Sequence, residues 1–296
     1  MVRIQKLVLI AASLTVLSAV AGASGLQPPA DAPMPDLEHF KAEVRKRLDP
    51  DRDVLSQYTY MERREEIDVT RLGKVRKGPV KVYEVHPSPE PGNTWKRLIS
   101  VDGKPLSPSE LERNDRIHRE HLEARQRESP SERAKRERED AKDLAETRAA
   151  IDELFRLYDI KVVGRERLGG HPVIAVRLDP KPNYRPRTKE GEWMKHMRLR
   201  AWIHETDYEV VRAEADVLED VTVGWGLVGR IHKGASGRFD RTKVNGEVWL
   251  PRRAVVNATG RSLVFRTFTV DAVTEWWDFK RFRVETSEQV EGTDQR

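Results

Sequence analysis

Cysteine is absent from all 296 residues of this chain. The protein can therefore form neither a disulfide nor a cysteine-ligated metal site, and it has no thiol that could accept a lipid after a leader. Long apolar runs are missing too, since no stretch reaches the ~20 residues that a membrane-spanning helix needs. An excess of one charge is also lacking. The 54 basic and 49 acidic residues leave a formal charge of +5, which is not the footprint of a nucleic-acid-binding protein.

The chain begins with the features of an export signal. Arg3 and Lys6 precede the apolar run Leu7–Val20, and an Ala-Gly-Ala sequence then supplies the small residues at which signal peptides are cleaved. The run is short for a membrane span, which favours a cleaved signal peptide over a retained anchor. We therefore expect a signal peptide at 1–23 and a Pro/Ala-rich linker at 24–35. The mature protein is expected to be soluble, exported to a bacterial periplasm and without a stable membrane span.

The alternation of apolar and polar residues in Met197–Val217 predicts a β-hairpin. Period-two patterning gives each arm one apolar face and one wet face. The two apolar sets share a face only if the loop has an odd number of residues, either three or five starting at Glu205. The longer loop pairs Arg200 with Glu214, whereas the shorter loop pairs Arg200 with Arg212. Both loops are compatible with the sequence.

Two identical Ser-Pro-Ser-Glu sequences, at 107–110 and 129–132, predict the starts of two helices. In each, the first serine can cap the helix, proline occupies the first helical position and glutamate reaches back to the capping residue. We expect helices at 108–128 and 130–158, which together form a charged insertion over 107–158. Its polar faces favour a solvated helical hairpin docked only by its C-terminal end. The alternative is a mobile lid or a partner-binding arm.

Strand signals dominate the rest of the chain. Apolar runs separated by short turns predict an antiparallel meander. Beside the hairpin, the expected strands are 58–61, 80–85, 95–101, 160–168, 172–178, 221–231, 236–243, 247–257, 262–270 and 274–284. A short helix is expected at 36–48 and a proline-rich loop at 179–192. We predict an α+β fold, a curved antiparallel sheet of about ten strands (a half-open β-barrel) with helices covering its concave face. It forms one domain at 36–286, followed by a disordered tail at 287–296.

Motifs that look like catalytic or cofactor signatures fail on their context. Residues 224–229 (Gly-Trp-Gly-Leu-Val-Gly) match the letters of a dinucleotide fingerprint, but no helix opens after them. His118 and His121 share a helix face without a third metal ligand. Ser236 lacks the second glycine of a nucleophile elbow. We therefore predict a protein that is not an enzyme and has no catalytic residue, cofactor or metal site.

Small residues along neighbouring strands leave space on one face of the predicted sheet. If that face is concave, the space can hold a hydrophobic ligand, and the alternative is close packing by the apolar stripe of the second long helix. The residues predicted to form the wall of a ligand cavity are Leu199, Ala201, Ile203, Val211, Ala213, Ala215, Leu154, Phe155 and Tyr158.

Four segments within residues 158–285 resemble the LolA-like family of periplasmic outer-membrane lipoprotein-sorting proteins. They are 163–178 (VGRERLGGHPVIAVRL), 197–215 (MRLRAWIHETDYEVVRAEA), 224–234 (GWGLVGRIHKG) and 247–256 (EVWLPRRAVV). The resemblance implies an open, curved antiparallel sheet whose concave face is plugged by helices. It also implies a role in shielding acyl chains or other hydrophobic groups during periplasmic transit.

The expected function is therefore binding of a hydrophobic ligand, such as a lipid or a lipoprotein acyl chain, in the half-barrel cavity. Each buried methylene contributes ~0.8 kcal/mol, so a long chain needs few polar contacts to bind. The alternative is an envelope protein–protein interaction or stress-sensing module that uses the charged helical arm to contact a protein partner.

Overall fold

The computed structural model describes residues 33–48, 55–69, 75–88, 90, 92–223, 229–262 and 267–282. Several expected segments lie outside these residues. They are the signal peptide at 1–23, most of the linker, the tail at 287–296 and residues 224–228 of the glycine motif.

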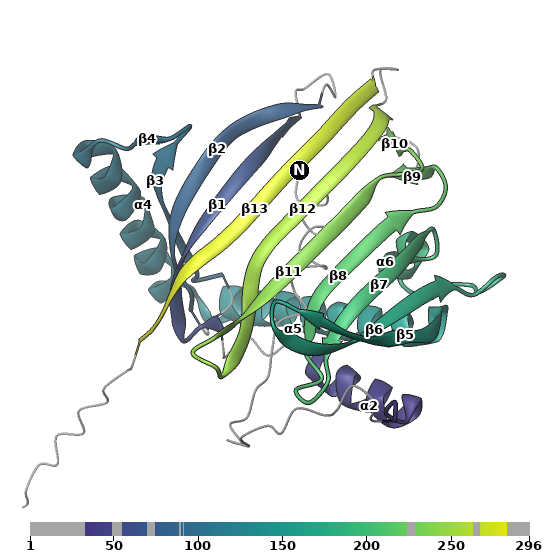
Figure 1. The fold of residues 1–296 in the computed structure, drawn as a ribbon. Helices are drawn as coiled ribbons and strands as arrows, with labels where there is room; N and C mark the ends of the chain where they lie inside the picture. Colours follow the sequence, from purple (N-terminus) through teal and green to yellow (C-terminus); the bar gives the residue numbers. More distant parts are fainter. Residues whose placement is uncertain are drawn as a thin grey trace, which may run out of the picture.

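Within these described residues, thirteen strands form a single antiparallel sheet (Figure 1). The strands are β1 (Tyr58–Val69), β2 (Val75–His86), β3 (Trp95–Val101), β4 (Lys104–Pro105), β5 (Tyr158–Leu168), β6 (His171–Pro180), β7 (Met197–His204), β8 (Val210–Val217), β9 (Val221–Val223), β10 (Gly229–Ile231), β11 (Ser236–Val244), β12 (Val248–Ser262) and β13 (Thr267–Arg281). In the part of the chain that the structure describes, four helices accompany them, α2 (Leu37–Leu48), α4 (Pro108–Gln126), α5 (Pro130–Leu157) and α6 (Lys189–Met194). The predicted α+β class is confirmed.

The order across the sheet is β4-β3-β2-β1-β13-β12-β11-β8-β7-β6-β5. The first strands of the chain therefore pair with its last strand, and they belong to the same sheet. β4 and β5 lie at opposite ends, so the sheet is open rather than closed into a barrel. The single strand expected at 221–231 is instead the short pair β9 and β10, and β10 pairs with the end of β12.

The β7–β8 hairpin has the register of the five-residue loop. Arg200 stands opposite Glu214, and their side chains form an ion pair of 3.1 Å. Arg198 likewise stands opposite Asp216. A register shift between Trp202 and Ile203, near the turn, then places Ile203 opposite Val210. Cross-strand charge pairing, which favours opposite signs, is thus satisfied in this register.

The two long helices are present as predicted, but the expectation that they dock only by the C-terminal end is wrong, because α4 also contacts β3. Both begin with the predicted capping box, at Ser107 and Ser129. However, α4 lies along β3 at one end of the sheet, whereas α5 runs behind the sheet (Figure 1). With 28 residues, α5 is ~42 Å long at 1.5 Å per residue, enough to cross most of the sheet.

Polar and aromatic groups dock α4, which explains why no apolar stripe predicted its contact. Arg97 of β3 donates two hydrogen bonds to the Asp115 carboxylate, at 2.7 and 2.9 Å. The Trp95 ring stacks on the His118 imidazole with 4.5 Å between centroids and 3° between planes. A helix with no buried residue can therefore still be fixed to the sheet.

The main hydrophobic core lies between the helices and one half of the sheet. Phe40, Val44 and Leu48 of α2 and Leu157 at the end of α5 are buried against β6, β7 and β8. The 179–192 segment, expected to be a loop, contains the start of α6. Thr188 caps α6 by accepting a hydrogen bond from the Gly191 backbone N–H at 2.9 Å.

Candidate ligand-binding sites

Seven of the nine predicted cavity-wall residues lie in one apolar cluster on the helix-covered face. They are Leu154, Phe155, Tyr158, Leu199, Ala201, Ile203 and Ala213. Ala201 and Ala213 stand directly opposite each other on β7 and β8. Their small side chains allow α2 and α5 to approach the sheet closely.

The other two predicted residues lie outside that cluster. The register shift near the β7–β8 turn changes the direction of Val211, which packs with Val173 and Trp249 in a separate cluster. Ala215 stands opposite Leu199 and is half-buried. The alternation of the strand places Ala215 on the same face as Ala213.

A hydrogen bond and a buried carboxylate fix the end of α5 beside the apolar cluster. The Tyr158 hydroxyl donates to the Met194 carbonyl at 2.7 Å, and burial raises the pKa of Tyr158. Glu153 accepts hydrogen bonds from the Tyr184 hydroxyl at 2.8 Å and from the Arg187 backbone N–H at 2.9 Å. Although burial opposes it, these donors lower the pKa of Glu153. The helix end is therefore held to α6 and the loop before it.

An ion pair is buried next to the β7–β8 turn. Arg241 donates to the Glu209 carboxylate at 2.7 Å and to the Val210 carbonyl at 3.2 Å, and both charged side chains are almost fully buried. Burial raises the pKa of Glu209 and lowers that of Arg241. Each group thus depends on the other to remain charged in the interior.

A second polar cluster surrounds the Asp207 carboxylate. It accepts hydrogen bonds from Lys243 Nζ at 2.7 Å and from Trp249 Nε1 at 2.8 Å, and it lies 3.2 Å from His204 Nδ1. Burial would raise the pKa of Asp207, but the three donors lower it far below its ordinary value. The His171 ring lies edge-on to Trp249 with 4.9 Å between centroids. The Asp207 carboxylate therefore joins the β7–β8 turn to Lys243 of β11 and Trp249 of β12.

The described ranges contain no set of three or more histidine, aspartate or glutamate side chains gathered in a way that could hold a metal ion. His118, one of the two histidines at helical spacing, stacks on Trp95 instead of facing a ligand set. Within the same ranges, no helix has the length and apolar character to cross a membrane.

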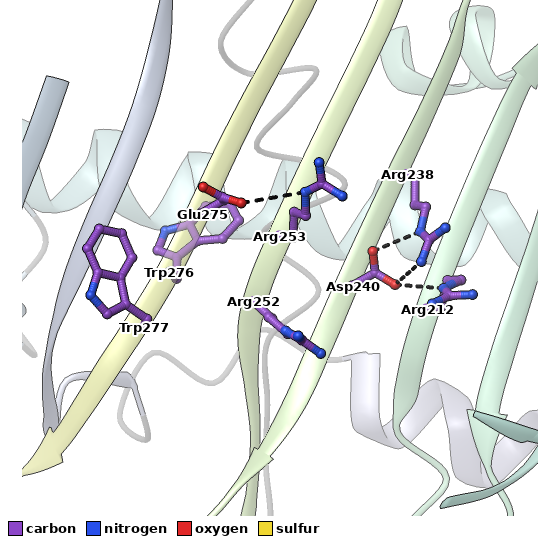
Figure 2. Close-up of a pocket in the computed structure, with 8 residues that line it drawn as sticks. All are labelled: Arg212, Arg238, Asp240, Arg252, Arg253, Glu275, Trp276 and Trp277. Atoms are coloured by element: carbon purple, nitrogen blue, oxygen red, sulfur yellow. Dashed lines mark hydrogen bonds and ion pairs between the residues drawn. The ribbon is translucent and has the colours of Figure 1, made fainter. Parts of the chain in front are cut away.

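A charged pocket lies on the opposite face of the sheet from α5. Figure 2 shows its charged side chains in front of the strands, with the helix behind. The pocket has a volume of about 530 Å³. It is lined by Arg212, Arg238, Asp240, Arg252, Arg253, Glu275, Trp276 and Trp277. Arg212 is the register neighbour of Trp202, one position away from the Ala201–Ala213 pair, and therefore points to the other face.

The pocket is built on a row of alternating charges that crosses five strands. Successive members of the row stand directly opposite each other in the register, in the order Arg212, Asp240, Arg253, Glu275 and Arg63. Ion pairs join Arg212 with Asp240 at 2.6 Å, Arg63 with Glu275 at 3.5 Å and Arg253 with Glu275 at 3.7 Å. Asp240 and Arg253 are neighbours in the register, but their contact is not an ion pair in the described residues. Opposite charges facing each other across strands stabilise a sheet.

Sequence reasoning missed this row and the pocket. Its members are far apart in the chain, and only the pairing of β1 with β13 and of β8 with β11 brings them together. One local signal was present, the doubled arginine after Pro251, because a proline within a strand marks an irregularity.

Comparisons with known proteins give only distant similarities. No family model matches the chain, and no curated protein matches it. Similar solved structures include a DUF1329 family protein from Desulfovibrio piger, with a TM-score of 0.30, 14% identity and coverage of 83% of this chain and 92% of that one. An outer membrane lipoprotein-sorting protein domain from Vibrio parahaemolyticus has a TM-score of 0.27 and 10% identity, with coverage of 83% and 92%.

The complex of MucA and MucB from Pseudomonas aeruginosa is a third similar structure. Its TM-score is 0.22 at 10% identity, with coverage of 83% of this chain and 99% of that one. Scores this low carry no argument about function. Any function therefore has to be argued from the residues of this chain.

Proposed function

We propose that this protein is a non-enzymatic envelope protein that binds a hydrophobic ligand, such as a lipid or a lipoprotein acyl chain. The ligand lies between the helix-covered face of the sheet and the helices α2 and α5. The observation that supports this proposal best is the apolar cluster, in which small residues on β7 and β8 face the apolar sides of two helices. Aliphatic walls with few polar groups suit an acyl chain.

α2 is the element that such a ligand would displace. Its apolar contacts come from Phe40, Val44 and Leu48, and an exposed ion pair joins its Arg45 to Asp152 of α5. Exposed ion pairs contribute little, so apolar burial supplies most of the energy that holds α2 in place. An acyl chain offers comparable apolar surface at ~0.8 kcal/mol per methylene and can compete for the same side chains.

A fluorescent fatty acid tests this proposal. Titration of the purified protein with a dansyl-labelled undecanoic acid should give saturable binding. Ala201→Phe, which fills the wall between sheet and helices, should weaken that binding at least tenfold. Val163→Phe adds the same ring at an exposed position of β5 and serves as the matched control, with binding unchanged. Equal binding by the wild type and both variants would count against a ligand site in this cluster.

A second candidate function is docking of an envelope protein on the helical arm. The supporting observation is that Ile117, a large apolar side chain, is 52% exposed on α4, a helix with no buried residue. A photo-crosslinking residue at position 117 should capture one protein in intact cells. The same residue at position 163, also exposed and apolar, should not capture it. Identical products from the two positions would reject a specific arm contact.

A further inference from the structure

The pocket on the helix-free face contains two consecutive arginines because β12 has a bulge. Asp240 stands opposite Arg253, but the next residue, Arg241, stands opposite Pro251, so Arg252 is an extra residue in β12. Proline cannot donate a ladder hydrogen bond, and a bulge redirects the side chains beside it. Strict alternation would send Arg252 and Arg253 to opposite faces, whereas both line this pocket (Figure 2).

The positive charge of the pocket is only partly neutralised. Asp240 is shared between Arg212 at 2.6 Å and Arg238 at 2.8 Å. Burial would raise the pKa of Asp240, but the two guanidinium groups lower it, so the carboxylate stays ionised. Four arginines and two carboxylates line the pocket, which leaves two positive charges in excess.

The unneutralised charge is concentrated on the bulge. Arg252 is exposed and has no ion pair or hydrogen bond with any described residue. Arg253 reaches Glu275 only at 3.7 Å, and Glu275 is also shared with Arg63 at 3.5 Å. Two neighbouring guanidinium groups therefore present free N–H donors at the same place.

An exposed aromatic ring forms one side of the same pocket. Trp277 is 41% exposed, whereas its neighbour Trp276 is buried and donates a hydrogen bond to Glu62 at 3.1 Å. Figure 2 shows Trp277 on the side of the pocket away from Arg238 and Arg212. An exposed tryptophan beside free arginines is typical of a surface that binds another molecule, because its ring can cover an apolar or sugar group.

We propose that this pocket binds a phosphate monoester, whose dianionic phosphate is held by Arg252 and Arg253 and whose organic part lies against Trp277. Guanidinium groups bind phosphate through paired N–H donors, and two free positive charges match a dianion better than a single carboxylate. A volume of about 530 Å³ exceeds what a bare phosphate fills, so room remains for the attached organic group. The phosphate can belong to a lipid headgroup or to a soluble ester, and both have the same chemistry at the arginines.

Two binding assays on the full chain test the proposal and distinguish the sources. The first is calorimetric titration with phenyl phosphate. The second is co-sedimentation with phosphatidylcholine vesicles that contain one-fifth phosphatidic acid, compared with pure phosphatidylcholine vesicles. Binding in either assay, weakened at least tenfold by the double change R252Q/R253Q and also weakened by Trp277→Ala, supports the proposal. Binding in the vesicle assay alone identifies the source as a lipid headgroup, and binding in the calorimetric assay identifies a soluble ester.

The matched control removes two other arginines of the same face. R198Q/R200Q takes the same charge from exposed positions on β7, outside the pocket, and should leave binding unchanged. Far-ultraviolet circular dichroism and thermal unfolding of every variant establish that the fold is retained. The proposal is overturned if the wild type binds neither probe, or if both double variants lose binding equally. It is also overturned if polyglutamate binds with the same dependence on Arg252 and Arg253, because the pocket then binds anions in general and does not select phosphate.

Discussion

At the scale of single residues, the buried ion pair between Glu209 and Arg241 is a site where one substitution leaves an unpaired charge in the interior. Both side chains lie out of contact with water, and the pKa shifts of both groups show the cost of removing charge from solvent. Arg241 also donates to backbone carbonyls of β8 and β12. It therefore joins two strands that are separate in the sequence.

Replacement of Arg241 by methionine should destabilise the protein by about 3–5 kcal/mol, because Glu209 is then left buried without its counter-charge. Chemical denaturation at pH 7 measures the change. The double variant E209L/R241M removes both charges and should recover a large part of the loss. If the double variant is as unstable as R241M, the effect comes from lost packing rather than from an unpaired charge.

At the scale of elements, the contact between α4 and β3 is sensitive to pH. The Trp95 ring lies between two imidazoles, with His118 at 4.5 Å on one side and His86 at 5.0 Å on the other. Burial lowers the pKa of His118, the charges of His121 and His86 lower it further, and Asp115 opposes the shift. The docked helix therefore favours the neutral imidazole.

Acidification should loosen α4. An undocked His118 has its ordinary pKa near 6.5, so as the pH falls it is protonated at a higher pH than the docked His118. Protonation of the undocked state alone weakens docking. The docking free energy is therefore complete above about pH 6.5 and decreases below it. Hydrogen exchange of α4 amides, corrected for the intrinsic pH dependence, should show less protection at pH 5.5 than at pH 7.5. His118→Phe keeps a stacked ring without a titrating group and should remove most of this difference. An unchanged pH dependence in that variant would assign the effect to other groups.

The elements were predictable where their signals are local. The five-residue register of the β7–β8 hairpin agrees with the pairing of Arg200 with Glu214, and the two capping boxes mark the starts of α4 and α5. The docking of α4 was not predictable, because Trp95 and His118 meet through stacking between separate elements. The position of Val211 depends on a register shift of one residue, which no period-two pattern contains.

At the scale of the whole molecule, one sheet has two chemically different faces. The helix-covered side of β6–β8 packs apolar residues of α2 and α5, whereas the other face has a row of alternating charges and a pocket rich in arginine. The antiparallel class follows from strand patterning. The order of the strands across the sheet does not follow from this patterning, because the pairing of β1 with β13 joins segments more than two hundred positions apart.

The function proposed for this protein is binding of a hydrophobic ligand at the helix-covered face. The most direct test is mass spectrometry of an organic extract of the full-length protein, purified without detergent from native envelope fractions. We predict that the extract contains a lipid or fatty-acyl species in stoichiometric amount, and that Ala201→Phe reduces it while Val163→Phe does not. An extract free of lipid from the wild-type protein, or equal lipid from all three proteins, would contradict ligand binding at this face.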